Sequence, residues 1–577
     1  MKNFENYIYT ILESKKKKKL VMFLTAAAFF LSLLMFPTKM VLAKMLPGKS
    51  ANTFSIYVDA PAGSSIKETK KLSTCVIDIL KEESEIQNIN LFLAQGIPLD
   101  YAGLVKGAAM KRTQNVSEIS INLSDKHLRD EPSYLMVQRL RPLIQKACVP
   151  IVRGSNIKFI EQPSGPPTLA SIVVEIRGDN LSKIRSLAVD VVDSLSNTEG
   201  LVDIDIMADN NFEKFELIPD KEKISRSGLS VKQVNEILYL AFEGMVIAHK
   251  NSKNSPDQIN MFLILDKESE TLFSKSVDSL QSKLSALNLM NKRGMLVPLS
   301  EVVTIKKVMS NHMIMHKDLA RMVNVIAETD MVSQVYPLLE ARDRLLEKFE
   351  KDYIITKAGF STYMFDFTLE ERKTGEKFLI RWDGEMKVTL DTFRDLGAAF
   401  IAALVLIFLL LVIYYKSFMI SGIVLLGSFL SLIGVIVGHW VANWFTTETF
   451  FLTATSLIGF IALIGISSRN SLLLIDFAKS LMESEGMQKR RAIAVAAATR
   501  SKPILLTAVA IILGSALLAG DPVFGGLGVA LISGTIAAVF VSLLFVPVLM
   551  DNAKAMDFDK DSDSDSKHGD NISIISS

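Results

Sequence analysis

The sequence predicts an α+β membrane protein in which six transmembrane helices carry a large region of strands and helices outside the membrane. Two observations predict this class. The chain has 577 residues, 49% hydrophobic and 22% charged, and these averages conceal a polar part, residues 44–392, flanked by apolar parts. Within the polar part, strand-like alternation and helix-like spacing follow one another in a regular order. The net charge is only +2, so nothing indicates a nucleic-acid partner.

The apolar segments are long enough to cross a bilayer, which takes about 20 apolar residues for about 30 Å of hydrocarbon. We expect one transmembrane helix in residues 20–43 and five in residues 398–550. The segments are 20–36 (extending to 43), 398–415, 417–441, 450–477, 503–519 and 523–550.

Basic residues indicate the orientation of these helices. Five lysines occupy positions 15–19, and the predicted loop between the fourth and fifth spans carries Lys479, Lys489, Arg490, Arg491, Arg500 and Lys502. Because cytoplasmic loops are enriched in Lys and Arg, residues 1–19 and a disordered acidic tail, residues 551–577, are expected in the cytoplasm. A cleaved signal peptide is the alternative for the first span, but its apolar stretch exceeds the usual length of about 7–15 residues.

The exported region begins with one βαββαβ unit, a ferredoxin-like arrangement, in residues 44–165. Its expected strands are 54–60, 86–94, 116–123 and 157–161, and its helices are 65–81 and 132–146. A second unit follows in residues 166–210 and 320–365, with strands at 171–178, 201–208, 321–328 and 353–360. An insertion, residues 211–319, interrupts it, and residues 366–397 are expected to form an amphipathic connector on the membrane surface with Trp382 at the interface.

Two cysteines, Cys75 and Cys148, are too few for a disulfide framework. One bridge between them stays open, but no motif indicates it, and both are interpreted best as small buried residues. The chain has no G-x-G-x-x-G after a strand and no P-loop, and GGLG at 525–528 favours close helix packing. Without an activated Ser or Cys beside a His, or a carboxylate pair in a pocket motif, the sequence predicts no enzyme and no cofactor.

The chain resembles the C-terminal half of a resistance–nodulation–division (RND) efflux permease of the hydrophobe/amphiphile, or acriflavin-resistance, type. The resemblance covers about residues 5–550. The matching strings are KMLPGKS, EQPSGPP, FRDLGAAF, GHW, TATSLIGFIALIGISSRNSLLLIDF, RSKPILLTA and DPVFGGLGVALISG.

This resemblance implies a multi-pass protein of the bacterial inner membrane with a large periplasmic region. The two βαββαβ units would be porter subdomains, and residues 211–319 would be the docking, or funnel, subdomain. The implied function is proton-driven export of hydrophobic or amphiphilic compounds by a split transporter. The implied partners are a separate N-terminal half, a trimeric assembly, a periplasmic adaptor and an outer-membrane channel.

An arginine near the middle of an apolar span, Arg469, is the main candidate functional residue. A lone arginine at this depth costs roughly 2.5–3.5 kcal/mol and is stable when it faces the bundle interior beside a partner. Within the chain Asp476, Asp395 and Asp521 are poorly placed to serve. The alternative is that Arg469 snorkels or fixes a helix–helix contact.

The resemblance implies that Arg469, Asn470, Arg500 and Thr507 form the proton relay, completed by two aspartates in the fourth span of the N-terminal half. Because arginine keeps its proton, the aspartates would titrate. For Asn470 and Thr507, interhelical hydrogen bonding is an equal alternative.

HMIMH, residues 312–316, places His312 and His316 on one face of a strand, as a metal site would require. The segment lies at the junction of the insertion, so we expect no metal site there. A metal-ion exporter and a non-transporting remnant or assembly subunit stay as alternative functions.

Overall fold

The computed structural model describes residues 2–556 except 49, 99–100, 163–164, 209, 255, 266–275, 312, 331, 360–362 and 447–448. The predicted disordered tail therefore lies, from residue 557 onward, outside the described residues.

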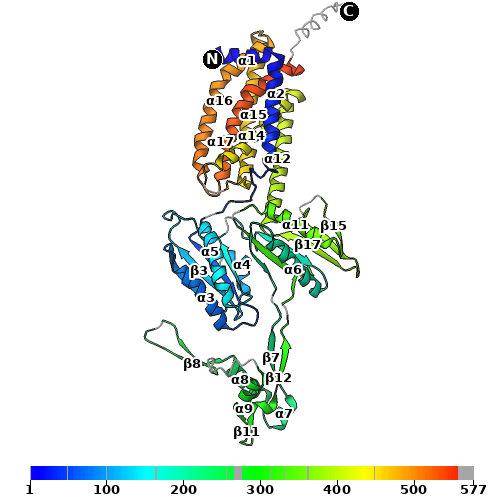
Figure 1. Ribbon diagram of the computed structural model, residues 1–577. Coiled ribbons are helices and arrows are strands. Elements are labelled where there is room, and N and C mark those ends of the chain that lie inside the picture. The colour runs from blue at the N-terminus through cyan, green and yellow to red at the C-terminus, as the bar shows by residue number, and fades with distance from the viewer. Residues whose placement is uncertain are drawn as a thin grey trace, which may run out of the picture. The chain divides into compact units, whose positions relative to one another are not determined.

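Five helices in the described part of the chain are long and apolar enough to cross a membrane, and they run side by side as a bundle (Figure 1). They are α12 (Glu385–Tyr415), α13 (Phe418–Phe429) continued by α14 (Leu432–Ala442), α15 (Ala454–Ser484), α16 (Lys489–Ala519), and α17 (Gly525–Phe540) continued by the π-helical η3 (Val541–Phe545) and α18 (Val546–Asn552). The first expected span forms α2 (Lys15–Leu34), whose first five residues are lysines. The sixth crossing therefore stays a prediction.

Two boundaries in the bundle differ from the sequence prediction. The basic residues from Lys489 to Lys502, predicted for a loop, lie in α16, because lysine, arginine and the intervening alanines favour helix. The third span is broken between α13 and α14, where the Ser431 hydroxyl donates to the Ser428 carbonyl at 2.6 Å. Such bonds from serine to its own helix often bend it.

The N-terminal segment, predicted only as a cytoplasmic end, contains the amphipathic helix α1 (Lys2–Glu13). Its Ile8, Ile11 and Leu12 are buried in the same apolar cluster as α16 and α18. At the same end of the bundle, Asp551 was predicted to begin the tail. Instead it closes α18 and forms an ion pair with Lys18 at 2.6 Å, so it belongs to the folded bundle.

The first unit of the region that we expect to be exported, called the first exported unit, contains a four-stranded antiparallel sheet. Its strand order is β2-β3-β1-β4, the order expected of a split βαββαβ unit. Its strands are β1 (Thr53–Asp59), β2 (Ile86–Leu93), β3 (Val116–Leu123) and β4 (Asn156–Glu161), its helices are α3 (Ile66–Leu80) and α5 (Ser133–Cys148), and short turns form α4 (Tyr101–Val105), η1 (Ala108–Met110) and η2 (Val149–Ile151). The core lies between the sheet and the two helices, and includes Phe54, Leu72 and Val137.

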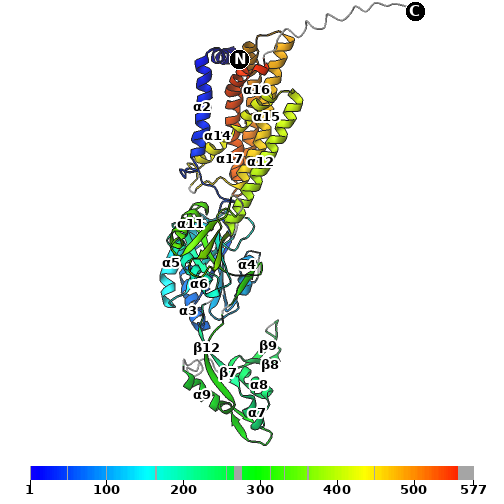
Figure 2. The ribbon, with the colours of Figure 1, turned by 90° about the vertical axis from the view of Figure 1, so that its right-hand side faces the viewer.

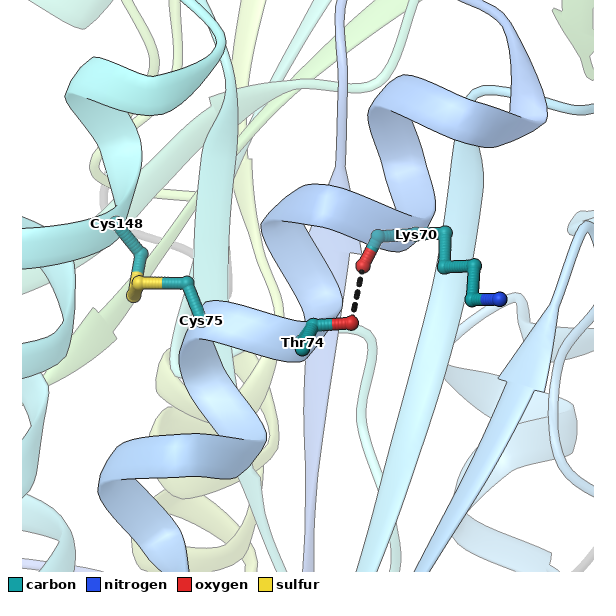
Figure 3. The surroundings of a disulfide bond; sticks show 4 residues. All are labelled: Lys70, Thr74, Cys75 and Cys148. Atoms are coloured by element: carbon teal, nitrogen blue, oxygen red, sulfur yellow. Dashed lines mark hydrogen bonds between the residues drawn. A yellow bond between two sulfur atoms is a disulfide. The ribbon is translucent and has the colours of Figure 1, made fainter.

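A disulfide joins the two helices of this unit and corrects the interpretation of the cysteines as separate small residues. Cys75 in α3 and Cys148 at the end of α5 are bonded, as Figure 3 shows. The two positions are 73 residues apart, so no short motif marked the pair. The bond fixes α3 to α5 on one face of the sheet.

The second exported unit differs from the predicted βαββαβ pattern. Its strands run in the order β13-β14-β5-β17-β16-β15, with β6 also paired to β14. They are β5 (Ile172–Arg177), β6 (Leu201–Ile206), β13 (Met315–Lys317), β14 (Ala320–Thr329), β15 (Tyr353–Lys357), β16 (Phe367–Glu371) and β17 (Lys377–Asp383), with helices α6 (Leu181–Ser196) and α11 (Val335–Phe349). Strands β16 and β17 thus separate the predicted fourth strand, β15, from β5.

The β16–β17 hairpin is the reason for this difference, and it overturns the amphipathic connector. Residues 366–397 form the hairpin and the start of α12 rather than a helix on the membrane surface. Trp382, predicted at the lipid interface, is buried and pairs with Val174 of β5. Its alternating neighbours Phe378 and Ile380 are buried too, which is the period of a strand.

The insertion folds as a separate unit of residues 208–313 together with 61–65. Its elements are β7 (Glu213–Pro219), α7 (Lys221–Arg226), α8 (Val231–Phe242), β8 (Met245–Lys250), β9 (Ile259–Leu263), α9 (Val277–Ala286), β10 (Asn288–Met290), β11 (Leu296–Pro298), α10 (Leu299–Val302) and β12 (Val303–Met309). The contribution of residues 61–65 was not predicted. Gly63 is needed there because its φ is +87° and an added Cβ would lie 2.9 Å from Phe212.

We predict that the double variant Cys75→Ser, Cys148→Ser lowers the thermal midpoint of the exported region, because removing a native cross-link typically costs about 2–4 kcal/mol. Unfolding of the purified chain followed by hydrogen exchange in β1 and β3 measures the change. Dithiothreitol should lower the midpoint of the wild type but leave the double variant unchanged. Equal midpoints for wild type and variant would contradict the prediction.

Candidate functional site

Helix α15 carries Arg469 at its midpoint. The helix begins at a capping box, in which Thr453 and Ser456 satisfy each other's backbone N–H groups. The Arg469 side chain lies on the surface of the bundle, and no carboxylate of the described residues forms an ion pair with it. Arg469 therefore faces away from the other helices of this chain.

Arg469 belongs to an exposed stripe along α15. We define the α15 stripe as Ile458, Ala462, Gly465, Arg469 and Leu473, which are all exposed. Their spacing of three or four residues places them on one helix face. Nothing lies within 4 Å of a Cβ added at Gly465, so the stripe is open to a neighbour.

Another face of α15 is packed inside the bundle and contains Asn470. Asn470 and the neighbouring Ser467 and Ser471 are buried. Since consecutive helical residues point about 100° apart, Asn470 and Arg469 serve different faces. Asn470 therefore does not share the exposed face that carries Arg469.

Asp476, the acidic residue of the same helix that lies nearer to Arg469 in the sequence, has another partner. It accepts a hydrogen bond from the Tyr415 hydroxyl at 2.7 Å. Tyr415 is the last residue of α12, so this bond joins the ends of α12 and α15. Asp476 thus has a hydrogen-bond partner of its own. The sequence had indicated that Asp476, two helical turns from Arg469, is poorly placed to pair with that arginine.

Among the described residues, no hydrogen bond or ion pair joins either relay candidate of α16 to Arg469. The Arg500 guanidinium lies 4.7 Å from the centre of the Phe477 ring, and its buried Nε has no hydrogen-bond partner among the described residues. The Thr507 hydroxyl donates to the Pro503 carbonyl one turn earlier, at 2.8 Å. Arg500 consequently keeps capacity for a further acceptor, whereas Thr507 has a local partner.

A buried histidine in α14 is a polar feature that sequence reasoning did not single out. His439 Nδ1 lies 2.7 Å from the Val435 carbonyl, and Nε2 lies 2.8 Å from Ser456 Oγ. Because a carbonyl only accepts, Nδ1 carries the proton and Nε2 accepts from the serine hydroxyl. This pair of bonds fastens α14 to the start of α15. The sequence did contain a signal for this feature, because His439 is a polar residue inside an apolar span.

A network of ion pairs links the two exported sheets, and it was also missed. Arg141 of α5 pairs with Asp203 of β6 at 3.1 Å and with Asp330, just after β14, at 3.0 Å. Burial raises the pKa of the Asp203 carboxyl, while Arg141 and the Phe159 amide act in the opposite direction. These residues are far apart in the sequence, so no spacing could reveal the pairs.

Further bridges flank Arg141. Lys158 of β4 pairs with Asp59 at 2.9 Å and with Asp205 of β6. Burial raises the pKa of the Asp59 carboxyl, but the ammonium groups of Lys158 and Lys111 lower it by more, to about 2. Lys106 pairs with Glu328 of β14 at 2.7 Å. The first sheet is thereby joined to the second by several partly buried charges.

A cavity of about 140 Å³ lies beside this network, where the segment after α2 passes the two sheets. Its lining includes Lys44, Arg141, Glu161 and Glu328. Burial raises the pKa of the Glu161 carboxyl to about 7, with Arg141 opposing the shift and Glu328 adding to it. Glu161 is therefore a carboxyl that changes its charge near neutral pH.

The HMIMH segment gains little support as a metal site. His316 lies in β13, opposite Arg321 in β14, and is exposed. His312 lies outside the described residues. In the described part of the chain, no group of three or more His, Cys, Asp or Glu side chains could hold a metal ion.

The bundle of apolar helices, the paired antiparallel sheets and the inserted unit define a membrane protein of mixed helices and sheets. The chain matches the AcrB/AcrD/AcrF family over residues 1–364 and 366–551. It belongs to this family of RND permeases, which are multi-pass membrane proteins.

Curated relatives are identical to this chain at about a fifth of the aligned residues. The chain is 23% identical over 526 residues to the swarming motility protein SwrC of Bacillus subtilis, covering 89% of this chain and 44% of that protein. It is 21% identical over 560 residues to the multidrug export protein AcrF of Escherichia coli, covering 95% and 48%. The chain thus spans about half the length of these relatives.

A solved structure has the same fold. The crystal structure of a heavy metal efflux pump superposes with a TM-score of 0.69 at 17% identity, covering 94% of this chain and 51% of that one. At this identity the likeness establishes the fold only.

We predict that Arg141→Ala destabilises the exported region by about 3–5 kcal/mol, because it leaves Asp203 buried without a counter-charge. Arg139→Ala, two residues away on α5, is the matched control. Arg139 pairs with Glu83 and Glu131 on the surface, so its loss should cost about 0–1 kcal/mol. Urea titration with hydrogen exchange of β4 and β6 measures both. Equal effects of the two variants would contradict a buried bridge.

The pKa of Glu161 predicts a pH dependence of stability. Its pKa of about 7 in the folded chain exceeds the value of about 4.3 in an unfolded chain, so folding favours the protonated form. Stability should then fall as the pH rises from about 4 to 7. Glu161→Gln should reduce the difference between the thermal midpoints at pH 5 and pH 8, whereas Glu370→Gln on the surface should not. An unchanged difference in Glu161→Gln would refute the assignment.

Proposed function

We propose that this chain is the C-terminal half of a proton-driven RND efflux transporter, and that a separate N-terminal half supplies the carboxylates of its proton relay. The observation that carries the proposal is the outward-facing Arg469, which has no acidic partner among the described residues. A guanidinium exposed to lipid at this depth costs roughly 2.5–3.5 kcal/mol. A neighbouring helix that carries aspartates and covers the α15 stripe would remove this cost.

The proposed relay has Arg469 as the fixed positive charge. Arginine stays protonated, so the aspartates of the partner take up and release the proton. When they are ionised, they pair with Arg469 and with the free Nε of Arg500. When they are protonated, the attraction weakens and the helices can shift. Asn470 and Thr507 then act mainly through helix packing.

Contacts near α12 offer a route from such a shift to the exported sheets. Strand β17 of the second sheet continues into α12 through Gly384. An added Cβ at Gly384 would lie 2.6 Å from the Ala170 carbonyl, and the residue has a φ of +87°, so only glycine fits. Gln334, before α11, donates to Thr389 of α12 at 3.1 Å. Movement of α12 would therefore be transmitted to strand β17 and to the start of α11.

The substrate class, the periplasmic setting and the larger assembly are parts of the same proposal. The similarity to a multidrug export protein supports hydrophobic or amphiphilic compounds as cargo. A trimer with a periplasmic adaptor and an outer-membrane channel is the corresponding assembly. The shared fold with a heavy metal efflux pump keeps a metal-ion cargo as the second candidate, and a non-transporting assembly subunit is the third.

We predict that Arg469→Ala strongly reduces dye efflux from cells that express this chain with its N-terminal half. The reduction should be roughly tenfold or more, equivalent to about 1.4 kcal/mol or more. Arg469→Lys should retain part of the activity. Lys479→Ala on the same helix is the control, since Lys479 lies near the helix end and pairs with Glu483.

Two outcomes would contradict this assignment. Efflux that is as fast in Arg469→Ala as in the wild type would remove Arg469 from the relay. Metal tolerance without dye efflux would favour the metal exporter.

Labelling gives an independent check, because both cysteines of the chain are bonded to each other. A cysteine introduced at Ile458 should react with maleimide in this chain alone and be protected by the N-terminal half.

A further inference from the structure

A second open surface of the bundle lies away from the α15 stripe. Helix α2 stands at one side of the bundle, next to α14 (Figure 2). An apolar groove of about 610 Å³ separates α2 from α17 and η3. Its lining from α2 includes Lys17, Leu24 and Ala28, and its opposite wall includes Phe540 and Leu544. We call this the α2 groove.

One end of the α2 groove is basic. Lys17 lines it, beside Tyr7 of α1. Of the lysines at positions 15–19, Lys18 is paired with Asp551, whereas the Lys17 ammonium pairs with no carboxylate among the described residues. The unpaired charge sits in the first turn of α2, where the helix dipole also favours an anion.

The length of the α2 groove matches one leaflet of a bilayer. From Lys17 to Ala28 the helix rises by about 16 Å at 1.5 Å per residue. The hydrocarbon layer is about 30 Å thick, so the groove runs from the basic membrane surface to about the midplane. A transmembrane helix of a partner would need a groove twice as long. An acyl chain whose headgroup lies at Lys17 has the required length and polarity.

The wall opposite α2 has an unusual backbone. Val541, Leu544 and Phe545 of the π-helical η3 line the groove. π-helical turns are rare and occur often at functional sites. Phe540, which directly precedes this turn, also lines the groove and is exposed.

We propose that the α2 groove binds one anionic phospholipid, with an acyl chain along α2 and the phosphate group at Lys17. Basic pockets between transmembrane helices on the cytoplasmic side recognise anionic headgroups through the same charges that set the orientation of the protein. The lipid would fill the space between α2 and the wall formed by α17 and η3. This inference is independent of the proton relay.

Native mass spectrometry of the purified full chain tests the proposal, with phosphatidylglycerol and phosphatidylcholine as probes. The wild type should retain one phosphatidylglycerol, with about fivefold preference over phosphatidylcholine. Lys17→Gln should remove the preference, and Ala28→Phe, which fills the groove, should reduce retention of both lipids. The matched controls are Lys16→Gln and Ala26→Phe, which lie on α2 but do not line the groove.

Three results would overturn the proposal. Equal retention of the two lipids by the wild type would exclude headgroup recognition. Equal effects of Lys16→Gln and Lys17→Gln would indicate loose attraction to the lysine run instead of a site. Undiminished retention in Ala28→Phe would show that the lipid binds elsewhere. Each variant's thermal midpoint, measured without added lipid, separates loss of binding from loss of folding.

Discussion

A charge removed from water is stable only beside an opposite charge, and this constraint organises both halves of the molecule. In the exported region it is met within the chain, because Arg141, Lys158 and Lys106 each reach a carboxylate of the neighbouring sheet. In the bundle it is not met, because Arg469 has no acidic neighbour among the described residues. Ion pairs therefore join the two subdomains of the exported region, whereas α15 carries a charge without an acidic partner among the described residues.

Periodicity predicted the parts of the fold that rest on local patterns. The apolar segments became helices. The first exported unit has the predicted strands because apolar residues, such as Phe54, Ile56 and Val58 of β1, alternate along the sequence. The β16–β17 hairpin escaped prediction because Phe378, Ile380 and Trp382 lie directly before a long helix, and the stretch looked amphipathic as a whole. Strand pairing with β5 decided its conformation, and a distant partner leaves no mark in a local pattern.

The candidate site was predictable in its residue types but not in its geometry. Arg469 stood out because a cation in an apolar span is costly wherever it points. Its outward direction depends on which faces of α15 pack against α13 and α17, and these contacts form only when the bundle is assembled. The disulfide and the pairs of Arg141 depend likewise on contacts between distant segments, so neither could be read from spacing.

The junction at Gly384 has a geometric consequence. Helix α12 is 31 residues long, or about 46 Å at 1.5 Å per residue. If its far end were held, a tilt of about 5° would displace its near end by about 4 Å. Strand β17 ends one residue away and is central in its sheet, so no flexible linker would absorb that displacement. Small angular changes in the bilayer would then become displacements of whole strands, comparable with the spacing between neighbouring strands.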